Sequence, residues 1–150
     1  MTNQAAVMLL AALGLVSGCN GGSDALGPDE LSFTVDEHLR TSEDHLGAAA
    51  NESVVGIGVG GVLGGSLCSH TVHPTGRVSG SNVSLTVEVR EIPRGPGDPP
   101  CLPVESVITY TALFRLPLGQ TYMVRVVHVQ QPGNEVTIPF EQPINVCCAR

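Results

Sequence analysis

Residue types that bind metal ions well occur together in one short segment, CSHTVH at residues 68–73. Thiolate and imidazole groups are preferred ligands of zinc and copper in proteins. On an extended strand Cys68 and His70 share a face while His73 lies on the other, so the segment supplies two ligands to one site. Further ligands must come from elsewhere in the chain, with His128 and Cys148 as candidates. We favour the alternative, a disulfide cysteine beside solvent-facing histidines, because an oxidised Cys68 no longer binds a metal.

Two other patterns suggest chemistry but have a simpler explanation. The glycines of GIGVGG at residues 56–61 match the GxGxxG pattern of dinucleotide-binding loops. Such a loop opens a helix and is followed by an acidic residue about 20 positions later. Neither feature is found in this sequence, so a strand of small residues or a bulged edge is the better explanation. The acidic and histidine-bearing stretch 36–45 offers cation ligands and acid–base groups, but its lack of periodicity indicates a solvated loop.

The sequence also lacks a recognisable nucleophile. It contains no GxSxG motif and no serine or cysteine in a known catalytic setting. The net charge of −7 argues against a nucleic-acid-binding surface, which needs clustered basic residues. We therefore expect neither an enzyme nor a nucleic-acid-binding protein, and no bound cofactor.

Alternation of apolar and polar residues dominates the second half of the chain. Residues 83–90 alternate strictly between aliphatic and polar side chains, which predicts a half-buried strand. Residues 121–129 repeat the pattern, with Tyr122 and Val124 on one face. The apolar, β-branched residues 107–114 predict a third strand. Weaker strand candidates are residues 31–35, 53–59, 67–73, 135–140 and 144–147.

Turn-forming residues separate these segments, and the chain contains 18 glycines and 11 prolines. Turns are expected at residues 64–65, 74–76, 79–82, 93–100, 117–119 and 132–134. The one helix candidate is residues 41–50, where Thr41 and Asp44 can form a capping box and Gly47 limits the helix to one or two turns. About seven short strands joined by tight turns predict an all-β fold, a β-sandwich. Aromatic residues make up only 3% of the chain, so its core must be aliphatic.

The segment LPLGQTYMVRV at residues 116–126 resembles the turn and strand of fibronectin type III and other Ig-like domains. In those domains a Leu and a Pro precede a Tyr whose hydroxyl caps the corner. The resemblance implies an Ig-like antiparallel sandwich with Tyr122 as the corner tyrosine. The domain as a whole is similar to small Ig-like domains of bacterial lipoproteins that have no assigned activity.

The N-terminus carries an apolar run of twelve residues, AAVMLLAALGLV at positions 5–16. It is too short to cross a bilayer as a helix, which takes about 20 residues, and it fits the core of a secretory signal. The next residues, Val16-Ser17-Gly18-Cys19, resemble the lipobox of bacterial lipoproteins. The resemblance implies a lipid on Cys19, a removed signal at residues 1–18, a lipidated flexible tether at 19–30 and a folded domain at 31–150.

The residue after the lipobox bears on the destination of the protein. Asn20 stands where a retention signal would have Asp, which favours the outer membrane or the cell surface. The alternative is an ordinary secreted protein with an unpaired Cys19.

With Cys19 assigned to the lipid, four cysteines remain, and export to an oxidising compartment permits disulfides. Four thiols can pair in three ways. We favour Cys68 with Cys101, since both follow turn-rich stretches at expected strand starts. Cys147 and Cys148 are neighbours that point to opposite faces of a strand, so they do not easily share a partner. A strained vicinal disulfide, separate partners and free thiols all stay open for this pair.

Together these features predict a lipid-anchored protein of the bacterial cell envelope with one non-catalytic β-sandwich domain. Its partners are the membrane, through the lipid on Cys19, and a protein or glycan ligand; otherwise its role is structural. The first alternative is a periplasmic zinc- or copper-binding module that uses Cys68, His70 and His128. The second is a small enzyme or enzyme inhibitor that acts through its loops, such as the proline-rich residues 93–103.

Overall fold

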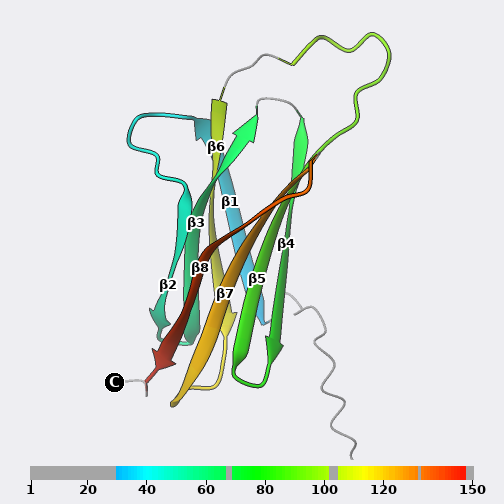
Figure 1. Cartoon of the computed structure of the whole chain (residues 1–150). Helices are drawn as coiled ribbons and strands as arrows, with labels where there is room; N and C mark the ends of the chain where they lie inside the picture. The colour runs from blue at the N-terminus through cyan, green and yellow to red at the C-terminus, as the bar shows by residue number, and fades with distance from the viewer. Residues whose placement is uncertain (1–29, 67–68, 102–104, 132, 148–150) are drawn as a thin grey trace, which may run out of the picture.

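The computed structural model describes residues 30–66, 69–101, 105–131 and 133–147, which form eight strands and no helix (Figure 1). The strands are β1 (Leu31–Leu39), β2 (Gly47–Ser53), β3 (Gly56–Ser66), β4 (His70–Ser79), β5 (Asn82–Glu91), β6 (Glu105–Arg115), β7 (Gln120–Gln131) and β8 (Glu135–Val146). The predicted lipobox and signal lie outside the described residues.

The strands form two four-stranded sheets, in the orders β1-β6-β3-β2 and β4-β5-β7-β8. The sheets pack face to face, so the predicted all-β sandwich is confirmed, with eight strands in place of about seven. One pairing differs from the expected antiparallel arrangement, because β5 and β7 run parallel. This pair sets the connectivity apart from Ig domains, whose two sheets are antiparallel.

The parallel pair depends on β6. Parallel neighbours need a crossover connection, whereas antiparallel ones can be joined by a tight turn. Here the chain leaves β5, enters β6 in the opposite sheet, and returns through the turn at residues 116–119 to β7. A strand thus fills the place that a helix takes in most crossovers.

The predicted helix at residues 41–50 is wrong. Residues from Gly47 onward belong to β2, where they pair with β3. Thr41 and Asp44 do interact as a cap, since an Asp44 carboxylate oxygen accepts hydrogen bonds from the Thr41 backbone nitrogen at 2.7 Å and from its hydroxyl at 2.9 Å. The cap closes one turn only, because strand pairing offers the following residues a complete set of backbone partners.

Two expected turns, at residues 64–65 and 74–76, are also wrong, since they lie inside β3 and β4. Pro74 is tolerated because β4 is an edge strand, and β8, the other edge of the same sheet, carries Pro139 and Pro143. The remaining expected turns that the structure describes join strands as predicted. The candidate at residues 53–59 is divided between β2 and β3 by a turn at 54–55.

The glycine-rich strand β3 is an inner strand between β6 and β2, not a bulged edge. Its glycines make room for neighbouring side chains. A Cβ atom on Gly61 would overlap the hydroxyl and ring of Tyr110, which lies opposite on β6. A Cβ atom on Gly65 would lie 2.6 Å from Ser106 Oγ. The resemblance to a dinucleotide-binding loop therefore reflects packing.

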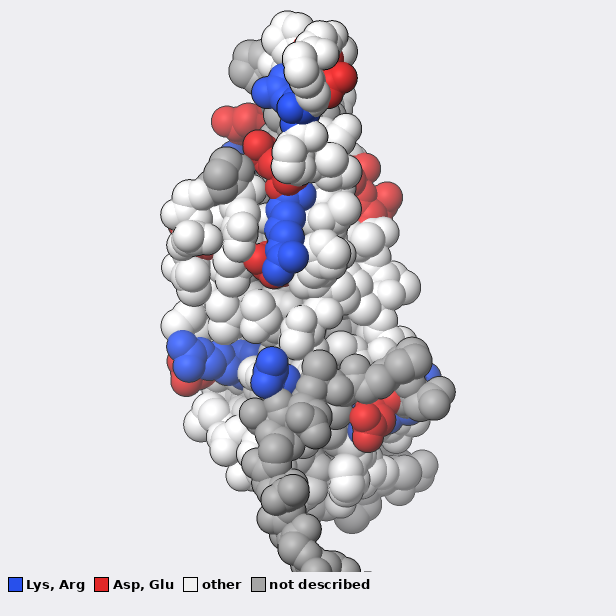
Figure 2. All heavy atoms as spheres, turned by 90° about the vertical axis from the view of Figure 1, so that its right-hand side faces the viewer, with Lys and Arg blue, Asp and Glu red and all other residues white. Residues whose placement is uncertain are grey.

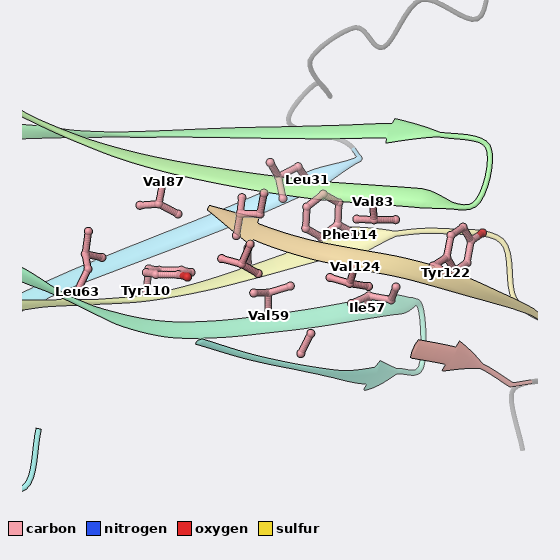
Figure 3. Packing of buried hydrophobic residues seen from close by; sticks show 14 of the residues in the cluster. Leu31, Ile57, Val59, Leu63, Val83, Val87, Tyr110, Phe114, Tyr122 and Val124 are labelled. Atoms are coloured by element: carbon pink, nitrogen blue, oxygen red, sulfur yellow. The ribbon is translucent and has the colours of Figure 1, made fainter. Parts of the chain in front are cut away.

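The core fills the space between the sheets (Figure 3). The two alternating segments bury the faces that their patterns predict. The fully buried side chains come from both sheets and include Ile57, Val83, Leu85, Val87, Ile108, Phe114, Tyr122, Val124, Val126 and Val146. Aliphatic residues thus provide most of the apolar burial, with Phe114 and Tyr122 as the largest members.

Tyr122 closes the core at the end where β7 begins. Its side chain is 1% exposed. Its hydroxyl donates a hydrogen bond to the carbonyl of Pro117 at 3.0 Å, and the amide nitrogen of Gln120 donates to that hydroxyl. This bond to a carbonyl a few residues upstream is the contact that defines a corner tyrosine.

We expect Gly61→Ala to lower the free energy of unfolding by about 3 kcal/mol or more, because the added methyl overlaps Tyr110 inside a packed core. Gly58→Ala is the matched control on the same strand. Its Cβ would have Asn51 O as its nearest neighbour, at 3.9 Å. Urea unfolding measures both variants, and equal effects of the two substitutions would contradict this account of β3.

Tyr122→Phe keeps the ring and removes the hydroxyl. We expect the free energy of unfolding to fall by about 1 kcal/mol, the usual net value of one hydrogen bond. Denaturant unfolding of the variant measures the loss. A variant as stable as the parent would show that the bond to Pro117 does not stabilise the corner.

Candidate functional site

The interior of the sandwich changes from apolar to polar along its length. On β7 the inward row of Tyr122, Val124 and Val126 continues as His128 and Gln130. The polar end is the one at which β5 and β7 both finish, and where the connections 40–46 and 92–101 lie (Figure 1). Polar side chains of both sheets therefore meet at one end of the domain.

The centre of this region is a buried pair, Tyr110 on β6 and His128 on β7. The Tyr110 hydroxyl lies 2.7 Å from His128 Nε2, and the two rings meet edge to face with centroids 5.6 Å apart. Phe33 stacks on the other side of Tyr110, also at 5.6 Å. Tyr110 is 3% exposed and His128 is 5% exposed. The pair joins the two sheets through their interior.

Burial decides the charge of this pair. It lowers the pKa of His128 to about 4 and raises the pKa of Tyr110. Removal from water disfavours the charged form of each group, imidazolium for His128 and phenolate for Tyr110. Both side chains are therefore neutral at neutral pH, which lets the core contain them without an opposite charge.

A second polar cluster lies along the side of the sandwich where β1 of one sheet approaches β4 of the other. One carboxylate oxygen of Glu37 accepts a hydrogen bond from Ser106 Oγ at 2.6 Å. The other lies 3.2 Å from His70 Nε2. Glu37 stands between the hydroxyl and the imidazole, and Ser106 is 1% exposed. A nucleophilic serine would need the histidine as its direct partner and an open approach, so this cluster connects the sheets and does not activate Ser106.

A cavity of about 270 Å³ lies beside His128, at the seam of β2 and β3 with β7 and β8. β2 begins at Gly47 opposite Val62, so the carbonyl of Gly64 lies beyond the end of that strand. The amide nitrogen of Gln130 reaches across from the other sheet and donates to this carbonyl at 2.6 Å. The register of β8 against β7 also shifts between Val126 and His128, as in a β-bulge. The late start of β2 and the bulge between β7 and β8 thus leave space for the cavity between the two sheets.

A wider hollow of about 320 Å³ lies between the two clusters, lined among others by Arg40, His70, Glu105 and Gln131. Its charges are largely paired. Arg40 bonds Glu105 at 2.9 Å, and Gln131 donates to Glu88 at 2.7 Å. Figure 2, which views the molecule from the right-hand side of Figure 1, shows charged side chains of both signs in its upper half, above a largely uncharged band.

The acidic and histidine-bearing stretch at residues 36–45 is divided between β1 and the connection that follows it. His38 Nε2, near the end of β1, lies 3.1 Å from the carboxylate of Asp44 in the connection that follows. The backbone hydrogen bond from Thr41, and then the bond from His38, lower the pKa of Asp44. Of residues 36–45 all but the half-buried Asp44 are exposed, so most of the stretch is solvated as expected.

The structure separates the histidines of the predicted metal site. His70 faces inward and His73 is exposed on the opposite face, as the strand pattern predicts. His70 pairs with Glu37, whereas His128 bonds Tyr110. Within the described residues no group of three or more His, Cys, Asp or Glu side chains could hold a metal ion. Cys68 and Cys148 lie outside those residues.

The disulfide between Cys68 and Cys101 stays a prediction, because Cys68 is not among the described residues. The last residue of β3, Ser66, pairs with Glu105 at the start of β6. Cys101 is half-buried, and Cys147 is an exposed free thiol whose backbone nitrogen donates to Glu52 at 2.8 Å. Cys19 also lies outside the described residues.

Sequence reasoning missed Tyr110, Gln130 and Glu37 as members of the polar end. Tyr110 lies inside the predicted strand at 107–114, whereas Gln130 and Glu37 lie just beyond the predicted strands at 121–129 and 31–35. Both continue the inward alternation of those strands. The alternation shows which side chains of a strand face inward, but it does not show which of them contact inward side chains of another strand.

No protein-family model, curated protein or solved structure matches this chain. In the described part of the chain, no helix has the length and apolar character needed to span a membrane. The function must therefore be argued from the sequence and from the geometry of the domain.

The burial of His128 makes stability depend on pH. As the pH falls from about 6.5 toward about 4, the unfolded chain gains a proton on His128 that the folded chain resists. The free energy of unfolding should therefore decrease by roughly 3 kcal/mol over this range because of His128. Urea unfolding at a series of pH values measures this loss.

His128→Gln should flatten this part of the profile. The same substitution at the exposed His45 serves as the control and should leave the profile unchanged. If His128→Gln retains the full decrease, another group is responsible.

Proposed function

We propose that this chain is a lipid-anchored protein of the bacterial cell envelope, and that its sandwich is a non-catalytic binding or structural domain. The observation that carries the proposal is the segment Val16-Ser17-Gly18-Cys19, which follows an apolar run too short to cross a bilayer. Acyl chains on Cys19 would hold the protein on a membrane, since each buried CH₂ group contributes about 0.8 kcal/mol.

The direction of β1 supports this arrangement. β1 begins with Leu31, which pairs with Phe114 at the apolar end of the core, and it finishes at the polar end. Nine residues of strand place the two ends about 30 Å apart. A tether joined to residue 30 would therefore attach the domain by its apolar end, and the polar end would point away from the membrane.

The polar end has the character of a surface that contacts a partner. It carries the connections between strands, which commonly bear binding residues on a rigid scaffold. Its guanidinium, carboxylate and amide groups surround the hollow near Arg40 and Gln131. These groups donate and accept hydrogen bonds, and the pairing of opposite charges leaves no strong field of one sign. Such a surface suits a protein or glycan partner better than a polyanion.

Replacement of the lipidated cysteine tests the anchoring. We expect Cys19→Ser to move the protein from the detergent-rich to the aqueous phase in detergent partitioning, and to block processing by the lipoprotein signal peptidase. Cys147→Ser is the matched control, because it makes the same change at an exposed free thiol of the domain. It should partition and mature like the parent.

Inhibition of the lipoprotein signal peptidase gives a second measurement, and it should lead to accumulation of the precursor. Membrane fractionation and maturation that are both unaffected by Cys19→Ser would refute the proposal.

A further inference from the structure

The cavity beside His128 contains an unused hydrogen-bond donor. The Tyr110 hydroxyl has His128 Nε2 as its only acceptor within the described residues. The arrangement that satisfies the Tyr110 donor directs its proton to Nε2, and the proton of the neutral imidazole is then on Nδ1. Among the described residues Nδ1 has no hydrogen-bond partner, yet no buried side-chain nitrogen there is left unpaired. Nδ1 is consequently not fully buried, and His128 lines this cavity.

The lining of the cavity is mainly apolar. Leu46, Val62, Leu63 and Pro139 provide aliphatic surface, while Gly47 and Gly64 leave room for a ligand. The amide nitrogen of Gln130 donates a hydrogen bond to the Gly64 carbonyl, which holds this part of the cavity lining in place. An apolar cavity with a few placed polar groups is the usual form of a small-molecule site.

The charges around the cavity select against ions. The lining residues that the structure describes include no Arg or Lys, and their one acidic group is the exposed Glu135. An anion would therefore meet a carboxylate and no cation. A cation could pair with Glu135 but would leave Nδ1–H without an acceptor. An uncharged molecule with an acceptor oxygen avoids both penalties.

The size of the cavity limits the ligand. Its volume of about 270 Å³ lies just below the range of sites for drug-sized ligands. A single ring with one carbonyl oxygen is of suitable size. Leu46 is 53% exposed and Leu63 is 2% exposed, so the lining extends from the surface, at Leu46, to the core.

We propose that this cavity is a binding site for a small uncharged molecule with an apolar body and a carbonyl or hydroxyl oxygen that accepts a hydrogen bond from His128 Nδ1–H. The site goes beyond the protein or glycan partner at the polar end, and it does not require the lipid on Cys19. Failure of the anchoring experiment would therefore leave it intact, and the reverse holds as well.

The first test is the protonation state of His128. A long-range ¹H–¹⁵N correlation spectrum of the full chain at neutral pH distinguishes the two neutral imidazole forms. We expect the proton on Nδ1. A proton on Nε2 would overturn the proposal, because the cavity would then present an acceptor.

The second test is a titration of the ¹⁵N-labelled full chain with ε-caprolactam, an apolar ring with one carbonyl. We expect saturable shift changes at residues lining the cavity, with a dissociation constant of about millimolar for so small a molecule. Azepane has the same ring as a cation, and caproate is a six-carbon anion. Both should bind at least about tenfold more weakly, because protonated azepane offers Nδ1–H no acceptor and caproate brings its charge near the Glu135 carboxylate.

Two matched variants locate the binding. Leu46→Trp fills the mouth of the cavity and should weaken caprolactam binding by about tenfold or more. Leu39→Trp makes the same change at a leucine that is 57% exposed and does not line the cavity, and it should bind like the parent. The proposal is overturned if caprolactam shifts no lining residue, if either ion binds as tightly, or if the two variants behave alike.

Discussion

The parallel pairing of β5 with β7 is the constraint on which the rest of the structure depends. It forces the intervening strand β6 across to the opposite sheet, where β6 pairs with both β1 and β3. The inward side chains of β6 then sample the whole length of the interior, from Phe114 at the apolar end through Tyr110 to Ser106. Parallel strands also finish at the same end of a sheet, so the connections after β5 and β7 emerge together. The gathering of loops and polar groups at one end is therefore a result of the connectivity.

The polar end is compatible with a stable core because its polar side chains satisfy one another's hydrogen bonds. Tyr110 is a large side chain in a chain with few aromatic residues, and it fits because Gly61 has no side chain. Its hydroxyl and the imidazole of His128 satisfy each other, and burial keeps both uncharged. The cluster of Glu37, Ser106 and His70 at the opposite seam retains a carboxylate, which is tolerable because Glu37 is partly exposed and accepts two contacts. Two different solutions thus let polar groups enter the space between the sheets.

Much of the fold could be predicted from the sequence, because alternation in residues 83–90 and 121–129 directly reflects which faces are buried. The prediction of individual elements failed where the local residue types favour one structure and strand pairing or packing imposes another. Gly64 and Gly65 of β3 were predicted as a turn because glycine favours no particular backbone conformation, whereas the room that Gly65 leaves for Ser106 explains a glycine inside the strand. Residues 41–50 read as a helix because a cap was visible and the pairing of β2 with β3 was not. The candidate site could not be predicted for the same reason. The contact of Tyr110 with His128 depends on a strand order that no local pattern specifies.

The two tyrosines of the chain lie at opposite ends of its core, and the chain has no tryptophan (Figure 3). Tyr122 is fixed at the corner where β7 begins, and Tyr110 is enclosed between Phe33 and His128. Each phenol therefore absorbs and emits light from a distinct environment, without a stronger chromophore to obscure it. The domain carries an intrinsic optical probe at each end, so that fraying of the loop-bearing end and opening of the corner where β7 begins would be separable by their ultraviolet spectra.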